Sequence, residues 1–513
     1  MPFKLRRVSM AAVPGKAYLI GAGPGDPGLL TLRGRQRLGE ADLVLHDYLV
    51  NPRILDWARP GAELVCLGRH GHGRIFSQDD IHEQMISAAR RGLVVARLKG
   101  GDPAIFARTS EETAALEAAG VPYEIVPGVT AAQAASSYAG VPLTHREAAS
   151  CVAFVAGQQC RDKGGEALDM EGLARFPGTL VFYMGVTSAP EWATALLAHG
   201  KPGETPVAIV RHASLPQQET TMTTLAELPR VLAPGAMRPP AIIVVGEAAA
   251  ARPSVDWFGS RPLFHRTVLV TRPAHQSESL VERLSELGAN VLVQPAIEIG
   301  PPADWAAADA AITQLRAFAW LVFSSANGVR FFLDRLAHHG FDLRALGGVR
   351  LAAIGPGTSD ALAEYHLQAD LQPDEFRAEA LAQSLLPAVV GKRVLLLRAS
   401  RGREVLAETL SAAGAEVDQA VVYESRDITN VDADILTALR NREIDWITVT
   451  SSAIARSLVA LFGNDLHQAK LAAISPLTAG VLADAGYVSA AVATPYTTAG
   501  LVDAILAAES GES

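Results

Sequence analysis

Short apolar runs alternate with longer segments of helical periodicity along almost the whole chain. The helical pattern is clearest over Gln78–Arg91 and Ser110–Ala119. Strands that alternate with helices predict parallel sheets with helices on their faces, so the pattern is typical of an α/β fold. The predicted strands of the first half are Ala17–Ile20, Asp42–Leu45, Glu63–Leu67, Val94–Leu98, Tyr123–Val126, Val152–Ala156, Thr179–Tyr183, Val207–Val210 and Ala241–Val245.

Breaks in this alternation predict the domain boundaries. The turn Pro127–Thr130 divides residues 16–250 into two lobes, at about 16–128 and 129–250. Residues 251–265 have no repeating period and contain two Arg-Pro pairs, which indicates a linker. The alternation then resumes at Val268–Thr271 and predicts a second domain over residues 266–510.

The second half contains an internal repeat. LAAIGPGT at Leu351–Thr358 corresponds to LAAISPLT at Leu471–Thr478, and upstream of them FSSA at Phe323–Ala326 corresponds to TSSA at Thr450–Ala453. Two matched pairs in the same order predict two similar α/β lobes. Chance similarity among strand-to-turn sequences is the alternative.

Composition narrows the function classes. Of the 513 residues 49% are hydrophobic, and the net charge of −9 argues against nucleic-acid binding, although an anionic small molecule still fits a locally basic cleft. Three cysteines without zinc-ligand spacing (Cys66, Cys151 and Cys160) favour a reducing compartment and predict no metal site. We expect a cytoplasmic protein without a signal peptide or membrane segment, and with residues 1–15 as a disordered tail.

A glycine-rich loop, GAGPGDPG at Gly21–Gly28, follows the first strand. Gly23, Gly25 and Gly28 satisfy G-x-G-x-x-G, so a NAD-dependent reductase is one interpretation. Pro24 and Pro27, however, remove two of the backbone N–H groups on which a phosphate loop depends. We therefore favour a rigid turn in which glycines allow close backbone approach, and a purely structural turn is the remaining alternative.

Five further motifs lie at strand ends or turns of the first half. They are RLKGGDPAIF at Arg97–Phe106, PGVTAA at Pro127–Ala132, VPLTHR at Val141–Arg146, VFYMGV at Val181–Val186 and PPAIIVVGE at Pro239–Glu247. Together with GAGPGD they resemble the tetrapyrrole methylase family, and most of all its uroporphyrinogen-III C-methyltransferases. The resemblance implies two α/β lobes with S-adenosylmethionine between them, and methylation of uroporphyrinogen III at C2 and C7 to precorrin-2, for siroheme or cobalamin.

The resemblance also implies roles for individual residues. Asp47 corresponds to the proposed catalytic base, although by itself it would be interpreted as a helix cap or turn residue. Substrate carboxylates are expected at Arg33, Arg69, His145 and Arg146. The expected cofactor contacts are Pro24, Gly100, Gly101, Asp102, Ile105, Thr130, Ala131, Met184 and Ala213.

Three positions depart from the family pattern. Arg69, in GRHG, replaces a lysine proposed as proton donor, and arginine can bind a carboxylate but is a poor general acid. FARTSEE at Phe106–Glu112 lacks three glycines of the family motif FGRGGEE, and Ala213 stands where glycine is usual. These departures bear on rate and product control more than on the fold.

Motifs of the second half resemble the uroporphyrinogen-III synthase family over residues 266–510. In order they are VLVTRP, FSSANGV, AIGPGT, FRAEA, VLLLR, VVYE, VTSSA and VATPYTTAGL. That family has no cofactor, joins two α/β lobes by a two-stranded connection, and closes hydroxymethylbilane while inverting its last ring. Its product is the substrate of the methyltransferase, so the fusion is consistent with two consecutive steps.

Polar residues after the strands of this half are the candidate site. Tyr423 corresponds to a tyrosine proposed to help the hydroxyl group leave, although it is also consistent with a tyrosine at the edge of the core. Hydroxyl groups expected to bind substrate carboxylates are those of Ser324, Ser325, Thr358, Ser451, Ser452 and Thr478. A non-catalytic binding module is the alternative for this half. The expected partners are tetrapyrroles and a second copy, through the methyltransferase half, but neither nucleic acid nor membrane.

Overall fold

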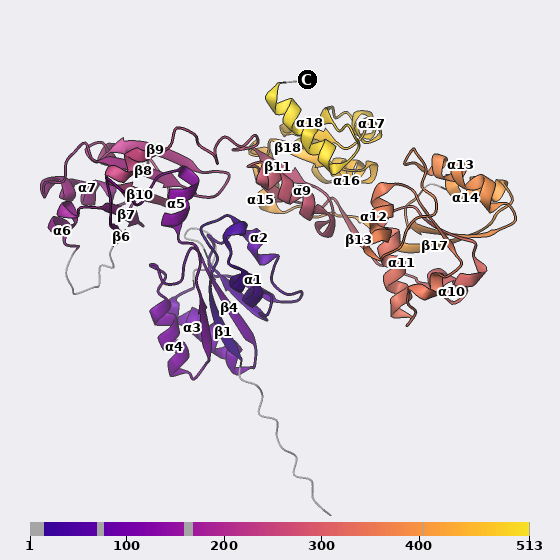
Figure 1. Cartoon of the computed structure of the whole chain (residues 1–513), viewed down its shortest axis with the longest axis horizontal. Coiled ribbons are helices and arrows are strands. Elements are labelled where there is room, and N and C mark those ends of the chain that lie inside the picture. Colours follow the sequence, from indigo (N-terminus) through magenta and orange to yellow (C-terminus); the bar gives the residue numbers. More distant parts are fainter. Residues whose placement is uncertain (1–14, 69–75, 159–167, 403, 512–513) are drawn as a thin grey trace, which may run out of the picture. The chain divides into compact units, whose positions relative to one another are not determined.

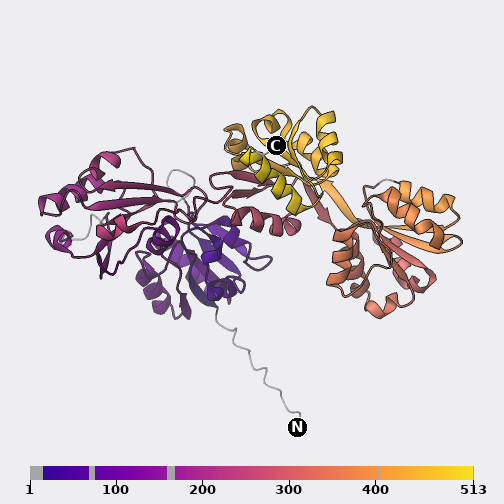
Figure 2. The same ribbon diagram turned by 45° about the horizontal axis from the view of Figure 1, so that its top comes forward.

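The computed structural model describes residues 15–68, 76–158, 168–402 and 404–511 (Figure 1). The predicted tail therefore lies outside the described residues except for Gly15. The chain divides into two compact units, which meet at Arg266 and Thr267, with Ser285–Asn290 counted in the first unit. In the part of the chain that the structure describes, each unit holds two five-stranded sheets. Figure 2 shows helices packed on these sheets, so the predicted α/β class is confirmed.

The first lobe is built on a parallel sheet of strand order β3-β2-β4-β1-β5. Neighbouring residues of β1 pack on opposite faces, Leu19 with Met85 and Ile20 with Leu38. Figure 1 shows α3 and α4 on one face and α1 and α2 on the other. The elements are β1 (Lys16–Gly21), α1 (Leu32–Leu38), β2 (Leu43–His46), α2 (Pro52–Leu55), β3 (Glu63–Cys66), α3 (Gln78–Arg90), β4 (Val94–Lys99), α4 (Thr109–Ala118) and β5 (Tyr123–Val126).

The second lobe has a mixed sheet of order β6-β7-β10-β8-β9, so the prediction of a parallel sheet is wrong here. Only β6 and β7 pair in parallel, whereas β10 runs antiparallel to β7 and β8, and β9 to β8. Residues 212–218 join β8 to β9 directly, and so short a connection permits only an antiparallel pair. The elements are α5 (Ala131–Ala139), β6 (Val152–Ala156), α6 (Met170–Arg175), β7 (Thr179–Tyr183), α7 (Ala189–Ala198), β8 (Pro206–Arg211), β9 (Glu219–Thr224), α8 (Leu228–Val231) and β10 (Ala241–Val245).

Much of the segment predicted to be a linker packs against the end of α5. Trp257 Nε1 donates to the Ser137 carbonyl at 2.8 Å, and Arg252 Nε donates to the Ala139 carbonyl at 2.7 Å. Phe258 is buried, with its ring centroid 4.8 Å from that of Tyr138. These anchors are single side chains without a period, so periodicity does not reveal that the segment packs on the first unit.

The second unit has two lobes joined by a two-stranded ribbon. Its sheets have the orders β12-β11-β18-β19-β20 and β13-β17-β16-β14-β15. The end of β17 pairs antiparallel with β13, and this ribbon carries the chain into the second sheet's lobe and back. The strands are β11 (Thr267–Val270), β12 (Asn290–Val293), β13 (Ile297–Gly300), β14 (Trp320–Phe323), β15 (Arg350–Ala353), β16 (Arg393–Ala399), β17 (Glu416–Asp427), β18 (Trp446–Val449), β19 (Lys470–Ala473) and β20 (Ser489–Val492).

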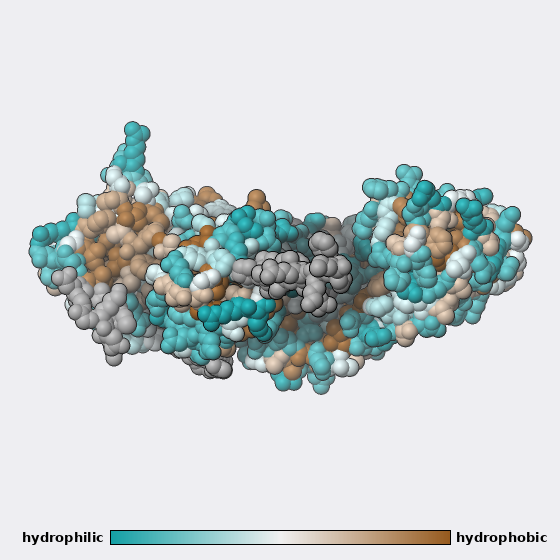
Figure 3. Space-filling view, turned by 90° about the horizontal axis from the view of Figure 1, so that it is seen from below, coloured by the Kyte–Doolittle hydropathy of each residue, from teal (hydrophilic) through white to brown (hydrophobic). Residues whose placement is uncertain are grey.

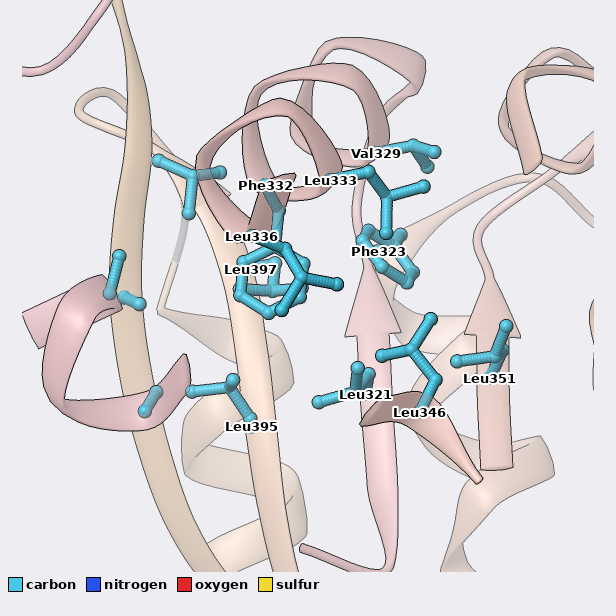
Figure 4. Close-up of a cluster of buried hydrophobic side chains, with 14 of the residues drawn as sticks. Leu321, Phe323, Val329, Phe332, Leu333, Leu336, Leu346, Leu351, Leu395 and Leu397 are labelled. Atoms are coloured by element: carbon cyan, nitrogen blue, oxygen red, sulfur yellow. The ribbon is translucent and has the colours of Figure 1, made fainter. Parts of the chain in front are cut away.

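The internal repeat of the sequence is a repeat of structure. In both lobes a buried strand, β14 or β18, leads into a helix capped by a serine: Ser325 accepts from Gly328 N, and Ser451 from Ile454 N, each at 3.1 Å. Figure 4 shows Phe332 and Leu336 of α11 packed against the strands beneath. The helices are α9 (Ala274–Glu286), α10 (Ala306–Thr313), α11 (Ala326–His338), α12 (Pro356–Glu364), α13 (Ala378–Val389), α14 (Val405–Ala412), α15 (Ala433–Arg440), α16 (Ser452–Phe462), α17 (Pro476–Asp484) and α18 (Thr498–Ser510).

The face drawn in Figure 3 is mainly hydrophilic, with apolar patches between the polar areas. Among the described residues, no helix is long and apolar enough to cross a membrane.

Candidate active sites

A cavity of about 440 Å³ lies between the two lobes of the first unit, at the ends of β1, β2 and β4 and of strands in the second lobe. Every residue predicted to touch the cofactor lines it, and so does Asp47. The lining residues absent from that prediction are Gly23, Tyr48, Leu49, Phe106, Gln158, Tyr183, Val186, Thr187, Val210, His212, Leu215, Pro239, Pro240, Ala241 and Ile242.

The glycines of the cavity let three loops approach one another closely. Gly23 N donates to the Gly101 carbonyl at 3.1 Å, and Gly101 N donates to the Gly23 carbonyl at 2.7 Å. A Cβ on Gly128 would lie 2.3 Å from the Gly101 carbonyl oxygen, which backbone cannot accommodate. The G-x-G-x-x-G loop therefore pairs with a neighbouring loop, and its Gly23 N–H is already used, which disfavours a dinucleotide phosphate cradle.

Asp102 joins two of these loops through its carboxylate. Oδ1 accepts from Ala104 N at 2.7 Å, and Oδ2 accepts from Gly128 N at 2.9 Å. Each oxygen keeps a further lone pair, so the group can still accept a hydrogen bond from a ligand amine or hydroxyl.

Tyr183, at the end of β7, holds the start of α5 at the cavity. Its hydroxyl lies 2.7 Å from Thr130 Oγ1 and accepts from Ala132 N at 3.1 Å, and burial raises the pKa of the phenol. Three lining residues that are not glycine have a left-handed backbone conformation: Phe106 (φ 52°), Met184 (φ 53°) and His212 (φ 51°). Such strain gathers at functional sites, where the surrounding structure enforces it.

Asp47 connects the cavity to a buried ion cluster, which we define as Arg97, Lys99, Glu112 and Asp47. Arg97 Nη2 lies 2.6 Å from Asp47 Oδ1, while the Asp47 side chain remains 35% exposed. Glu112 is fully buried and bonds both Arg97 Nε at 3.0 Å and Lys99 Nζ at 2.6 Å. Burial lowers the pKa of Lys99.

A second cavity, of about 580 Å³, lies between the lobes of the second unit. Its floor is the connecting ribbon: alternate residues of β17, namely Tyr423, Ser425 and Asp427, face it together with Ile297 and Ile299 of β13. The walls are Arg272, Pro273, Gln276, Asn327, Ala399, Arg401, Gly402, Thr450, Ser451, Ala453, Ile454, Arg456, Ser457 and Ala460.

Tyr423 is the phenol of this cavity. It is 8% exposed, and burial raises its pKa. Ser325 Oγ donates to the Tyr423 hydroxyl at 3.0 Å, so the phenolic proton itself is directed elsewhere. The ring stacks on Phe331 at a centroid distance of 5.9 Å, which fixes its plane.

Three arginines make the second cavity cationic. Arg401 is paired with Asp427 at 2.8 Å, and Ser457 donates to the same carboxylate. Arg272 follows β11 and is half-buried, and this burial lowers its pKa. No carboxylate among the described residues forms an ion pair with it. Arg272 can therefore receive a carboxylate ligand, and Arg456 lines the same cavity.

Comparison with known proteins assigns the two units to two families. Residues 16–229 match the family of tetrapyrrole (corrin/porphyrin) methylases, and residues 278–503 match uroporphyrinogen-III synthase HemD. A porphyrin biosynthesis protein HemD from Ruminiclostridium josui is 32% identical over 447 residues, which cover 87% of this chain and 88% of that protein.

This chain belongs to the tetrapyrrole methylase family, and its second half is a uroporphyrinogen-III synthase domain.

It is thus a bifunctional enzyme of porphyrin biosynthesis, with a methyltransferase unit and a synthase unit. The uroporphyrinogen-III C-methyltransferase of Bacillus subtilis is 35% identical over 365 residues, 70% of this chain and 74% of that protein. A solved structure of uroporphyrin-III C-methyltransferase from Thermus thermophilus is 41% identical and has a TM-score of 0.40, covering 46% of this chain and 100% of that one.

The predicted substrate contacts of the methyltransferase unit are placed less uniformly than its cofactor contacts. Arg33, on α1, forms an ion pair with Glu124 at 2.7 Å. Neither it nor His145 or Arg146 belongs to the described lining of the cavity. Arg69 lies outside the described residues. Phe106 and Tyr183 were missed, although both stand within the quoted motifs and next to predicted contacts.

In the synthase unit, Tyr423 and Ser451 line the cavity. The other predicted hydroxyl residues are not among its lining residues, and they lie at helix starts or bond to nearby groups. Ser325 caps α11 and donates to Tyr423, and Ser324 Oγ donates to the Leu397 carbonyl at 3.1 Å. Thr358 and Thr478 are buried in the first turns of α12 and α17, and Ser452 begins α16. Arg272 was missed, although VLVTRP contains it at a strand end.

Proposed function

We propose that the synthase unit closes hydroxymethylbilane to uroporphyrinogen III, and that the methyltransferase unit then methylates this product at C2 and C7 with S-adenosylmethionine. The observation that carries the proposal is that Asp47 and all the expected cofactor contacts line one cavity. Precorrin-2 would be the product, as a precursor of siroheme or cobalamin, in the cytoplasm. The homodimer expected through the methyltransferase unit belongs to the same proposal.

The residues of the first cavity fit S-adenosylmethionine. Gly100, Gly101 and Ala131 carry little or no side chain, so a ligand can approach their backbone closely, and Asp102 offers carboxylate oxygens to an amine or a ribose hydroxyl. Ile105, Val210 and Leu215 supply apolar surface for an adenine ring. When bound, this cofactor supplies an electrophilic methyl group.

The chain's own groups position and deprotonate the macrocycle. A macrocycle that accepts a methyl group at a pyrrole carbon becomes cationic and must afterwards lose a proton from another position, and the Asp47 carboxylate, partly exposed at the cavity, can receive it. The two lobes hold donor and acceptor in line, which is the main contribution that a methyl-transfer site makes.

In the second cavity Tyr423 assists the departure of water. Its raised pKa keeps the phenol protonated at neutral pH, and the proton that Ser325 does not receive can pass to the leaving hydroxyl. Arg272 and Arg456 would hold carboxylates of the linear tetrapyrrole while its last ring turns.

A coupled assay tests the whole proposal. The pure protein is incubated with hydroxymethylbilane and S-adenosylmethionine, and the product is identified by mass and absorbance. We expect a type III macrocycle that carries two added methyl groups. Unmethylated uroporphyrinogen, with S-adenosylmethionine unconsumed, would refute the methyltransferase proposal.

Asp102→Ala is expected to weaken S-adenosylmethionine binding by about 1.5–3 kcal/mol, the scale of a hydrogen bond to a charged group. Calorimetry on the full chain measures the affinity. Because Asp102 also accepts from Gly128 N, the melting temperature must be compared alongside. An unchanged affinity would rule out direct contact.

The two units are expected to fold when they are produced separately, because each has its own sheets and apolar clusters. A first fragment that ends at residue 266 should be more stable than one that ends at 255, by about 1.5–3 kcal/mol for buried Phe258 alone. Chemical denaturation of both fragments provides the comparison. Equal stability would show that residues 256–266 contribute nothing to the first unit.

A further inference from the structure

The ion cluster beneath the first cavity is built into β4 and α4. Arg97 and Lys99 are two residues apart in β4 and point to the same side of the sheet, where both are buried. Glu112, in the first turn of α4, accepts from both of them. Burying three charged groups is costly unless each has a partner, and here Glu112 is the partner of both Arg97 and Lys99.

Arg97 is fixed from three directions. Its Nε donates to Glu112, its Nη1 to the Leu98 carbonyl at 3.1 Å, and its Nη2 to Asp47. Among the described residues, Asp47 Oδ2 accepts one longer hydrogen bond, from Gly100 N at 3.3 Å. One oxygen of Asp47 is thus held by a rigid guanidinium, while the other stays available at the cavity.

We propose that Arg97 is a positioning residue that orients Asp47, and that Glu112 sets how strongly Asp47 binds a proton by offsetting the charges of Arg97 and Lys99. This inference rests on the proposed role of Asp47 as the base of methyl transfer. The cluster holds two cations and two carboxylates, and only one of the carboxylates faces the cavity. Glu112 therefore balances part of the positive charge that Arg97 and Lys99 bring to Asp47.

The sign of each change follows from the charges that remain. Without the Glu112 charge, two cations act on Asp47 and favour its ionised form, so it becomes a weaker base. Without Arg97, Asp47 loses its nearest cation and holds a proton more strongly. Other titratable groups near this region are His46 of β2, Glu111 of α4 with His82 of α3 and, on the cavity lining, Tyr48, Asp102, Tyr183 and His212, and all of them are unchanged in both variants.

The test is the pH dependence of kcat for methyl transfer to supplied uroporphyrinogen III, measured on the full chain. Relative to the wild type, Glu112→Gln is expected to move the midpoint of the acid limb about one pH unit down, and Arg97→Gln about one unit up. In both variants kcat at its plateau should fall about tenfold or more, because the base is misplaced in Arg97→Gln and weakened in Glu112→Gln. The affinity for S-adenosylmethionine should stay within about twofold, since neither Arg97 nor Glu112 is among the residues that line the cavity.

Glu117→Gln, on the same helix, is the matched control, because Glu117 accepts from Tyr123 away from the cavity. It should leave the profile unchanged. If Glu112→Gln fails to fold, Lys99→Met replaces it and must move the midpoint up, since a cation is removed. Midpoints that stay fixed, or that move in the same direction for Glu112→Gln and Arg97→Gln, would overturn the inference. A wild type that transfers no methyl group would instead refute the proposed function.

Discussion

Replacing Asp47 with asparagine is expected to lower methyl transfer by about 10²–10⁴-fold, the range for loss of a positioned general base. Asparagine keeps the size and can still accept one hydrogen bond from Arg97, so the local geometry should survive. S-adenosylmethionine should bind with nearly unchanged affinity, because the cofactor contacts lie on other residues. Single-turnover kinetics with uroporphyrinogen III measures the loss.

Two features make the Asp47 result specific. Asp79→Asn is the matched control, since Asp79 is an exposed carboxylate in the first turn of α3, and it should retain full turnover. If the methylated intermediate accumulates before deprotonation in Asp47→Asn, the block lies at the base itself. Near-normal turnover of Asp47→Asn would remove Asp47 from the mechanism.

The first cavity could be predicted well because its residues stand in local motifs at strand ends. In α/β sheets the carboxyl ends of strands meet at one edge, so residues far apart in sequence, such as Asp102 and Ala131, reach the same cavity. The predicted strands rest on buried apolar runs, which are the strongest local signal in a chain.

Other features could not be predicted from local pattern. The strand β9 has the polar sequence ETTMTT, without an apolar run to indicate it. Glu112 lies in FARTSEE, where the missing glycines attract attention, and only the structure shows it buried against Arg97. A carboxylate that pairs across elements leaves no periodic trace in the sequence.

Hydroxyl residues of the synthase unit show a different difficulty. A serine or threonine after a strand can bind a ligand or cap the following helix, and both uses favour the same position. Ser325 caps α11 and also donates to Tyr423, whereas Thr358 is buried in its helix. The cationic residue Arg272 reaches the second cavity from a strand end that carried no predicted contact.

Tyr423→Phe is expected to slow formation of uroporphyrinogen III by about 10²-fold or more, as loss of a general acid does. The ring should keep its place on Phe331, and Ser325 should still cap α11, so the fold should remain intact. Hydroxymethylbilane that is not converted closes unassisted to the I isomer, so chromatography should show the product changing from type III to type I. Tyr365→Phe, which removes a hydroxyl bonded to Asp334 outside the cavity, should keep the wild-type rate and isomer. Unchanged type III production by Tyr423→Phe would exclude the phenol as the acid, and a folded wild-type unit that yields only type I would leave a binding module in place of the synthase.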